Sequence, residues 1–153
     1  MHSLRTLGLL TDQEFQNLVD ATKTRKVSIW REGKLVERKY THFDKAKRMN
    51  PIETFSSKPE SKMTDAEKQQ YKDYVEEEAV AEMFRDYMDN KMKIGGKPQN
   101  LFNRILKFFR SLFMAHNDNG LETVEDIFDG IKTGKIGGTR KARESAREVR
   151  NFE

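Results

Sequence analysis

The fold is decided by the stretch Asn100-Leu-Phe-Asn-Arg-Ile-Leu-Lys-Phe-Phe-Arg-Ser-Leu-Phe-Met-Ala115. Its apolar residues recur at the three- and four-residue spacing of an amphipathic helix, and four of them are phenylalanine. Polar side chains such as Asn103, Arg104 and Lys107 fall on the opposite side. The sequence therefore predicts a helix over 100–115 whose wide apolar stripe must be buried against other protein.

We expect this stripe to bind a partner, because the rest of the chain offers little to cover it. The chain is 35% hydrophobic and 35% charged, whereas globular domains average roughly 45–50% and roughly 25%. The residues predicted to bind a partner are Leu101, Phe102, Ile105, Phe108, Phe109, Leu112 and Phe113. A membrane surface is the alternative occupant, since a cationic amphipathic helix can lie in the interface. The stripe is shorter than the roughly 20 residues that span a bilayer.

Capping and turn signals predict the other elements. The capping boxes Thr11-Asp-Gln-Glu14 and Thr64-Asp-Ala-Glu67 predict helices over about 12–23 and 65–92. Between them, β-branched and aromatic residues flank Glu32-Gly33, which predicts a β-hairpin over about 25–40. A further helix is expected over about 124–133. The predicted fold is mainly α with one N-terminal β-hairpin, and extended rather than compact.

Shifts in composition divide the chain into four segments. Residues 1–48 hold the N-terminal helix and the basic hairpin, and residues 49–63, which include Pro51 and Pro59, form a linker. Residues 64–136 form a helical domain. Residues 137–153 form a charged C-terminal tail with almost no core residues, which we expect to be exposed or docked on another chain.

The hairpin region is strongly basic. Residues 23–48 carry ten Lys or Arg against three acids, and Trp30 and Tyr40 are interleaved with them. Such a surface can bind nucleic acid through phosphate contacts and stacking. The alternative is a half-buried hairpin whose basic side chains are simply solvated. The residues that would contact nucleic acid are Lys23, Arg25, Lys26, Arg31, Lys34, Arg38 and Lys39.

The sequence carries no recognisable catalytic or cofactor motif. It has no cysteine, its three histidines form no zinc-binding spacing, and no phosphate-binding glycine loop is present. In the acidic run 76–78, Glu77 and Glu78 are weak candidates for metal ligands, and the alternative is a solvated helix face. We therefore expect a protein without a cofactor, and a binding protein rather than an enzyme.

Four pieces of the chain together carry a family resemblance: Glu76-Glu-Glu-Ala-Val-Ala-Glu-Met-Phe-Arg-Asp-Tyr87, Lys97-Pro98, Leu101–Phe113 and Thr123-Val-Glu-Asp-Ile-Phe-Asp-Gly-Ile-Lys-Thr-Gly-Lys-Ile-Gly137. Residues 74–140 resemble the segment that follows the zincin-like peptidase core in polyvalent proteins of bacteriophages and prophages. The resemblance implies that the protein comes from a phage and is carried in the virion. Before assembly it would be located in the host cytoplasm. The His-Glu-x-x-His motif that binds zinc in that family is absent here, while Glu77 or Glu78 stands where a third ligand would be.

Three functions are compatible with these observations. The leading hypothesis is a non-enzymatic virion protein, internal or attached to the portal or tail, that docks on other virion proteins in a multi-copy assembly. The first alternative is an ejected phage protein that contacts DNA or a membrane. The second alternative is a zincin-like metallopeptidase fragment that another chain completes.

Overall fold

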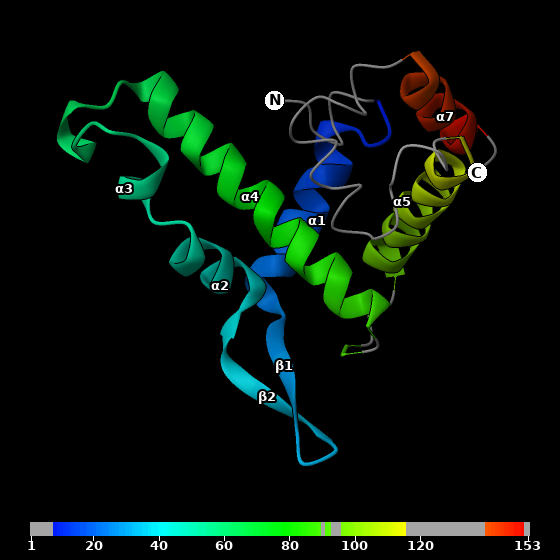
Figure 1. Ribbon diagram of the computed structural model, residues 1–153, viewed down its shortest axis with the longest axis horizontal. Helices are drawn as coiled ribbons and strands as arrows, with labels where there is room; N and C mark the ends of the chain where they lie inside the picture. Colours follow the sequence, from blue (N-terminus) through cyan, green and yellow to red (C-terminus); the bar gives the residue numbers. More distant parts are fainter. Residues whose placement is uncertain (1–7, 90, 93–95, 116–139, 152–153) are drawn as a thin grey trace. The chain divides into compact units, whose positions relative to one another are not determined.

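The computed structural model describes residues 8–89, 91–92, 96–115 and 140–151. These residues form six α-helices, one short 3-10 helix and a two-stranded antiparallel sheet (Figure 1). The prediction of a mainly α fold with one N-terminal β-hairpin is confirmed. The helix predicted over 124–133 lies outside the described residues.

The chain divides into two compact units. We call Leu18–Lys93 the central unit, and Met1–Asn17 together with Ile94–Glu153 the terminal unit. Helix α1 (Asp12–Thr24) begins in the terminal unit and ends in the central unit.

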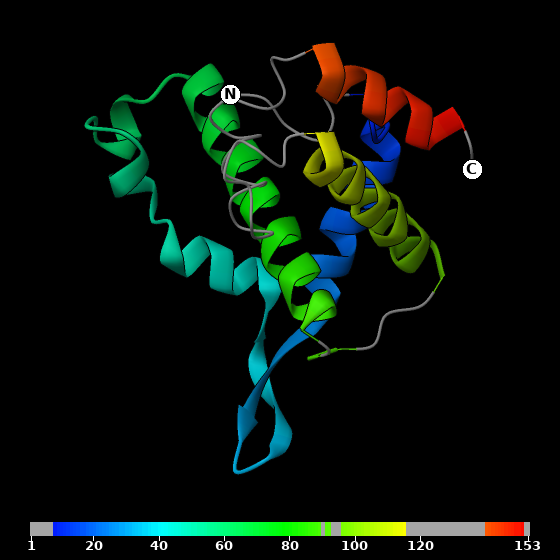
Figure 2. The same ribbon diagram turned by 45° about the vertical axis from the view of Figure 1, so that its right-hand side comes forward.

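The central unit is built around one long helix. Its elements after α1 are β1 (Lys26–Arg31), β2 (Lys34–Thr41), α2 (His42–Met49), α3 (Ile52–Phe55), the 3-10 helix η1 (Glu60–Lys62) and α4 (Asp65–Met88). Helix α2 packs along α4 (Figures 1 and 2). The predicted capping box of Thr64 and Glu67 starts α4, with each backbone N–H bonded to the other side chain.

The hairpin turn consists of Glu32 and Gly33. Their φ angles are 50° and 76°, and two positive φ angles define the type I′ turn that matches the twist of two-residue hairpins. The strands pair Arg31 with Lys34 beside the turn, and the register shifts between Lys26 and Ser28 near the base. The sequence prediction of a hairpin centred on Gly33 is confirmed.

Helix α2 starts at a capping box that the sequence analysis did not identify. The Thr41 hydroxyl accepts a hydrogen bond from the Asp44 N–H at 3.1 Å, and the Asp44 carboxylate accepts one from the Thr41 N–H at 3.2 Å. The hairpin therefore leads into the helix without a loop. The predicted linker over 49–63 contains two short helical pieces, α3 and η1.

Small side chains form the contact between α2 and α4. Ala46 of α2 and Ala79 of α4 are buried together with Val75, and Phe43 and Tyr71 pack against this cluster. Alanine at the contact lets two helix backbones approach closely, because no longer side chain has to fit between them. The chain can thus hold α2 against α4 with few apolar residues.

In the terminal unit, α5 (Gly96–Ala115) packs against α7 (Arg140–Asn151) (Figure 2). Ala146 of α7 is completely buried. The C-terminal segment was expected to be exposed or docked on another chain, and the structure instead places α7 against a helix of its own chain. Ala146 is a small residue in a helix that is otherwise mostly charged, which is why composition gave no sign of this contact.

Glu14 joins the first turn of α1 to the helices of the terminal unit. Its carboxylate accepts a hydrogen bond from the Thr11 N–H at 2.9 Å, as the predicted capping box requires. The same carboxylate lies 2.8 Å from Arg104 of α5 and 3.7 Å from Arg150 of α7. Arg104 also donates to the Leu9 carbonyl at 3.1 Å. The N-terminal turn is therefore held by charges from both helices.

We expect the stability of the terminal unit to depend on the charge of Glu14. Burial alone would raise its pKa, but hydrogen bonds from Thr11 and Arg104 outweigh burial and hold the pKa below its ordinary 4.5. A carboxyl whose pKa is lower when folded stabilises the fold above its unfolded pKa, and this contribution is lost as the pH falls through the folded pKa. Urea unfolding across the acidic range should therefore show a weaker pH dependence for Glu14→Gln than for the unmodified chain.

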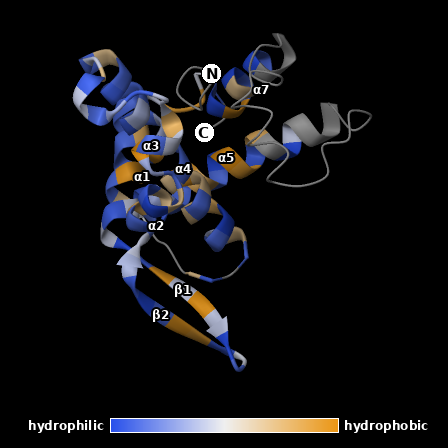
Figure 3. Cartoon of the chain, turned by 60° about the vertical axis from the view of Figure 1, so that its left-hand side comes forward, coloured by the Kyte–Doolittle hydropathy of each residue, from blue (hydrophilic) through white to orange (hydrophobic). Residues whose placement is uncertain are grey.

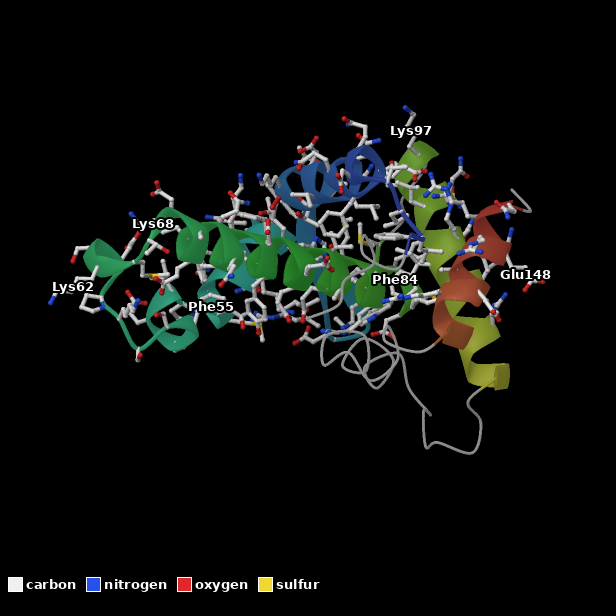
Figure 4. All side chains as sticks on the ribbon, turned by 90° about the horizontal axis from the view of Figure 1, so that it is seen from above. Phe55, Lys62, Lys68, Phe84, Lys97 and Glu148 are labelled. Carbon is white, nitrogen blue, oxygen red and sulfur yellow. The ribbon has the colours of Figure 1, made fainter. Side chains whose placement is uncertain are left out.

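Glu148→Gln is the matched control for this experiment. Glu148 is an exposed residue of α7 (Figure 4), and its replacement removes the same single charge. Equal pH dependence in the two variants would show that the contacts of Glu14 with Thr11 and Arg104 do not stabilise the folded state.

Candidate functional site

The apolar stripe that was predicted to bind a partner is largely buried within the chain. Leu101, Phe102, Ile105 and Phe108 of α5 are at most 5% exposed. The side chains of the other predicted partner-binding residues, Phe109, Leu112 and Phe113, are outside the described part of the structure. A partner would reach the four buried side chains only if this face of α5 were uncovered first.

Three of the four large apolar side chains that are exposed in the described part of the central unit lie on the β-hairpin, and the fourth is Met49 at the end of α2. Trp30 is 53% exposed, Leu35 41% and Val36 39%. The hairpin projects away from α2 and α4 (Figures 1 and 2), so those helices do not cover its far end. We define the hairpin tip as residues 30–36, all of which are exposed.

Strand register arranges these apolar residues as cross-strand pairs. Trp30 lies opposite Leu35, and Ile29 lies opposite Val36. Because successive side chains of a strand point to opposite faces, the two pairs occupy opposite faces of the ribbon. Hydrophobic segments are visible on both strands in Figure 3. The tip therefore offers apolar surface on both faces.

Basic side chains surround this apolar surface. Of the residues predicted to contact nucleic acid, the exposed ones are Lys23, Lys26, Arg31, Lys34 and Lys39, and the half-buried ones are Arg25 and Arg38. In the described part of the chain, no carboxylate lies within salt-bridge distance of Arg31, which ends β1, or of the basic residues of β2, namely Lys34, Arg38 and Lys39. Their charges are therefore available to a partner.

Two arginines flank an aromatic ring where β2 approaches α2. The guanidinium carbon of Arg38 lies 5.8 Å from the centre of the Tyr40 ring, and that of Arg48 lies 5.4 Å from it. These are cation–π distances. Arg48 lies in α2, and sequence reasoning did not select it because its nearness to Tyr40 depends on how α2 follows β2.

A depression at the base of the hairpin extends the polar surface. It is lined by Thr24, Arg25, Lys26, Ser28, Glu37 and Met92. The Nε atom of Arg25 is buried and has no hydrogen-bond partner among the described residues. Arg25 and Lys26 bring positive charge to this depression, and Glu37 brings a negative charge.

Buried His42 ties the base of the hairpin to α4. Its Nε2 lies 2.8 Å from the Asp86 carboxylate, and its Nδ1 lies 3.3 Å from the Arg25 carbonyl. The backbone N–H of His42 donates to the same carbonyl at 3.4 Å. His42 is 1% exposed and Asp86 6%. The sequence analysis missed this pair, because 44 residues separate its members and neither lies in a motif.

Acidic side chains of α4 form ion pairs with a lysine of α2 and with an arginine of α4. Glu82 lies 3.0 Å from Lys45 and 2.6 Å from Arg85, and Asp86 also lies 4.0 Å from Lys91. The acidic face of α4 is therefore partly used to hold α2, whereas the sequence analysis weighed a metal site against a solvated face. The weak metal candidates Glu77 and Glu78 are half-buried. Within the described ranges, no three His, Asp or Glu residues are grouped as a metal site requires.

Comparison with known proteins identifies no relative of this chain. No protein-family model, no curated protein and no solved structure matches this chain. None of the described helices combines the length and apolarity that crossing a membrane requires. The geometry of the hairpin is thus the main source of functional information.

Proposed function

We propose that this chain is a non-enzymatic binding protein and that its β-hairpin is the element that docks on the partner. The observation that carries this proposal is the exposure of Trp30, Leu35 and Val36 on a ribbon that projects from its own unit. Large apolar side chains in water are unfavourable, and their clustering on a surface is typical of an interaction site. A two-stranded ribbon is also only marginally stable by itself, and a partner would stabilise it.

The anchored base supports this proposal. His42 connects the Arg25 carbonyl at the start of the hairpin with Asp86 of α4, and Thr41 at the end of β2 caps α2. Both strands are thus fixed where they leave the helices. A binding element that is ordered beforehand loses less conformational entropy when it binds.

The arrangement of His42 and Asp86 favours binding over catalysis. A histidine–carboxylate pair can act as a general base when a substrate reaches the free ring nitrogen. Here both ring nitrogens face acceptors within the fold and the ring is buried. This pair therefore supports the position of the hairpin.

The family resemblance supplies the biological setting of the proposal. On that basis the chain is a bacteriophage virion protein that docks on other virion proteins through the hairpin. A DNA-contacting ejected protein is the second candidate, and the unpaired basic side chains of the hairpin favour it. A peptidase fragment completed by another chain is the third candidate, and it rests on the resemblance alone.

Site-specific photo-cross-linking tests the docking proposal. A photo-reactive amino acid replaces Leu35 in the protein produced during phage growth, and purified particles are irradiated. We expect the chain to be present in the particles and position 35 to form a cross-link that mass spectrometry identifies, because the hairpin tip contacts its partner there.

Position 70 provides the matched control. Gln70 is an exposed residue of α4, outside the hairpin, and should cross-link weakly or not at all. Equal cross-linking from both positions would contradict a specific role of the hairpin. Absence of the chain from the particles would contradict the virion setting, and absence of any cross-link from position 35 would contradict docking.

A further inference from the structure

The charge of the hairpin indicates what kind of partner it recognises. Residues 26–41 carry five basic side chains and two acidic ones, Glu32 and Glu37. Lys34 and Arg31 pair beside the turn, and Arg38 and Arg48 flank Tyr40 farther along. The basic surface thus runs from the tip to α2, a length over which a polyanion with regularly spaced charges can make several contacts.

We propose that the hairpin is a nucleic-acid-binding arm that lies in the groove of a duplex. This inference rests on the second candidate of the proposed function, a DNA-contacting protein, and names a duplex as the partner of the same hairpin. A two-stranded β-ribbon fits the major groove, and Arg and Lys side chains along it reach the phosphates on either side. Arg31, Lys34, Arg38 and Lys39 supply the phosphate contacts, and Trp30 at the tip supplies apolar contact with bases or sugars.

The depression at the hairpin base supports a phosphate ligand. Arg25, Lys26 and Ser28 line this depression. A phosphate there would be attracted by the charges of Arg25 and Lys26. Glu37 in the same lining opposes an anion. For this reason we assign the main phosphate contacts to the exposed basic residues nearer the tip.

The chain carries its own probe for the test. Trp30 is the single tryptophan of the sequence and is 53% exposed, so its fluorescence reports directly on the hairpin tip. The full chain is titrated with a DNA duplex of mixed sequence, and separately with a single strand of the same length. We expect the duplex to change the Trp30 emission saturably and to bind more tightly than the single strand.

Salt dependence measures the number of phosphate contacts. Four contacts predict a slope of log K against log salt near roughly −3.6, at about −0.9 for each phosphate. The double variant R31S/K34S should reduce the magnitude of the slope by about 2 and weaken binding roughly 10- to 60-fold at about 0.1 M salt.

The matched control is the double variant K62S/K68S. Lys62 ends η1 and Lys68 lies in the first turns of α4 (Figure 4), and both are exposed residues of the same unit. This variant loses the same two charges outside the hairpin and should keep both the affinity and the slope. Trp30→Phe should retain more affinity than Trp30→Ser, because the aromatic ring is kept; since both variants lack the tryptophan, their binding is measured by the anisotropy of a dye-labelled duplex.

Four results would overturn the proposal: no saturable binding, a slope that R31S/K34S does not change, equal weakening by K62S/K68S, or tighter binding of the single strand than of the duplex. If nucleic acid fails to bind while position 35 still cross-links to a virion protein, this inference falls and the proposed docking function stands. If duplex binds as expected and position 35 cross-links to no protein, the partner of the hairpin is nucleic acid alone.

Discussion

Replacing His42 by leucine is expected to destabilise the protein by about 3–5 kcal/mol. The reason is that Asp86, which is 6% exposed, would lose the imidazole that lies 2.8 Å from its carboxylate. Lys91 is 4.0 Å from the other carboxylate oxygen and would compensate only in part. The charge of Asp86 would then be buried without a close partner, which is among the most destabilising changes in a protein interior. Urea unfolding followed by circular dichroism measures the effect.

A double variant separates this explanation from simple loss of packing. In H42L/D86L both polar partners are replaced by apolar side chains, so no buried charge remains, and most of the lost stability should return. Lys47→Ala, at an exposed position of the same helix, should change stability by less than about 0.5 kcal/mol. If the double variant is as unstable as the sum of the two single variants, the interaction between His42 and Asp86 does not stabilise the fold.

The variant Phe84→Ala is expected to lower the free energy of unfolding by about 3–5 kcal/mol. Phe84 lies in α4, is 0% exposed, and is among the largest fully buried side chains of the described residues (Figure 4). Truncation would remove most of a buried ring and leave a cavity that the rigid helix can fill only partly. Thermal or urea unfolding checks this value.

Phe55→Ala is the comparison within the same unit. Phe55 in α3 is half-buried, and its ring lies 5.5 Å from the rings of Tyr71 and Tyr74. Since part of this ring is in water, its removal should cost clearly less than the removal of Phe84, on the order of 1 kcal/mol. Similar losses for the two variants would show that Phe84 does not occupy a tightly packed position.

Local signals explain which elements sequence reasoning could predict. The hairpin was found from Glu32-Gly33, because a tight turn needs backbone angles that glycine tolerates. The starts of α1 and α4 were found from capping boxes, and α5 from its apolar periodicity. Helix α2 was missed, since its capping box uses Asp44 in place of the usual Glu or Gln and its eight residues are mostly polar. Each of these signals is contained within a short run of neighbouring residues.

The arrangement of the elements depends on contacts that no local pattern encodes. His42 contacts Asp86, which lies 44 residues later in the sequence. Ala46 and Ala79 belong to one buried cluster, although neither alanine is part of a recognisable sequence pattern. The burial of Phe102 could not be told from the sequence either, because an apolar stripe is equally compatible with a core and with an interface.

The sequence predicted that the candidate site is basic, but it did not predict which side chains of the hairpin are exposed. The basic residues of the hairpin were selected from composition, and the structure places most of them in water. The exposure of Trp30 and Leu35 was not predicted, since β-branched and aromatic residues in a strand usually indicate a buried face. Only the direction in which the hairpin leaves α2 and α4 shows that its tip is uncovered (Figure 1).

The bonds that hold the first turn of α1 have a consequence for biosynthesis. Arg150 donates to the Gly8 carbonyl at 3.2 Å and lies near Glu14, so the segment before the central unit binds a residue that the ribosome adds 142 positions after Gly8. The continuous stretch Leu18–Lys93 can fold while translation proceeds, because all of its partners have then emerged. The segment before it can complete its contacts only after α7 has been synthesised, so the terminal unit forms later in translation than the central unit.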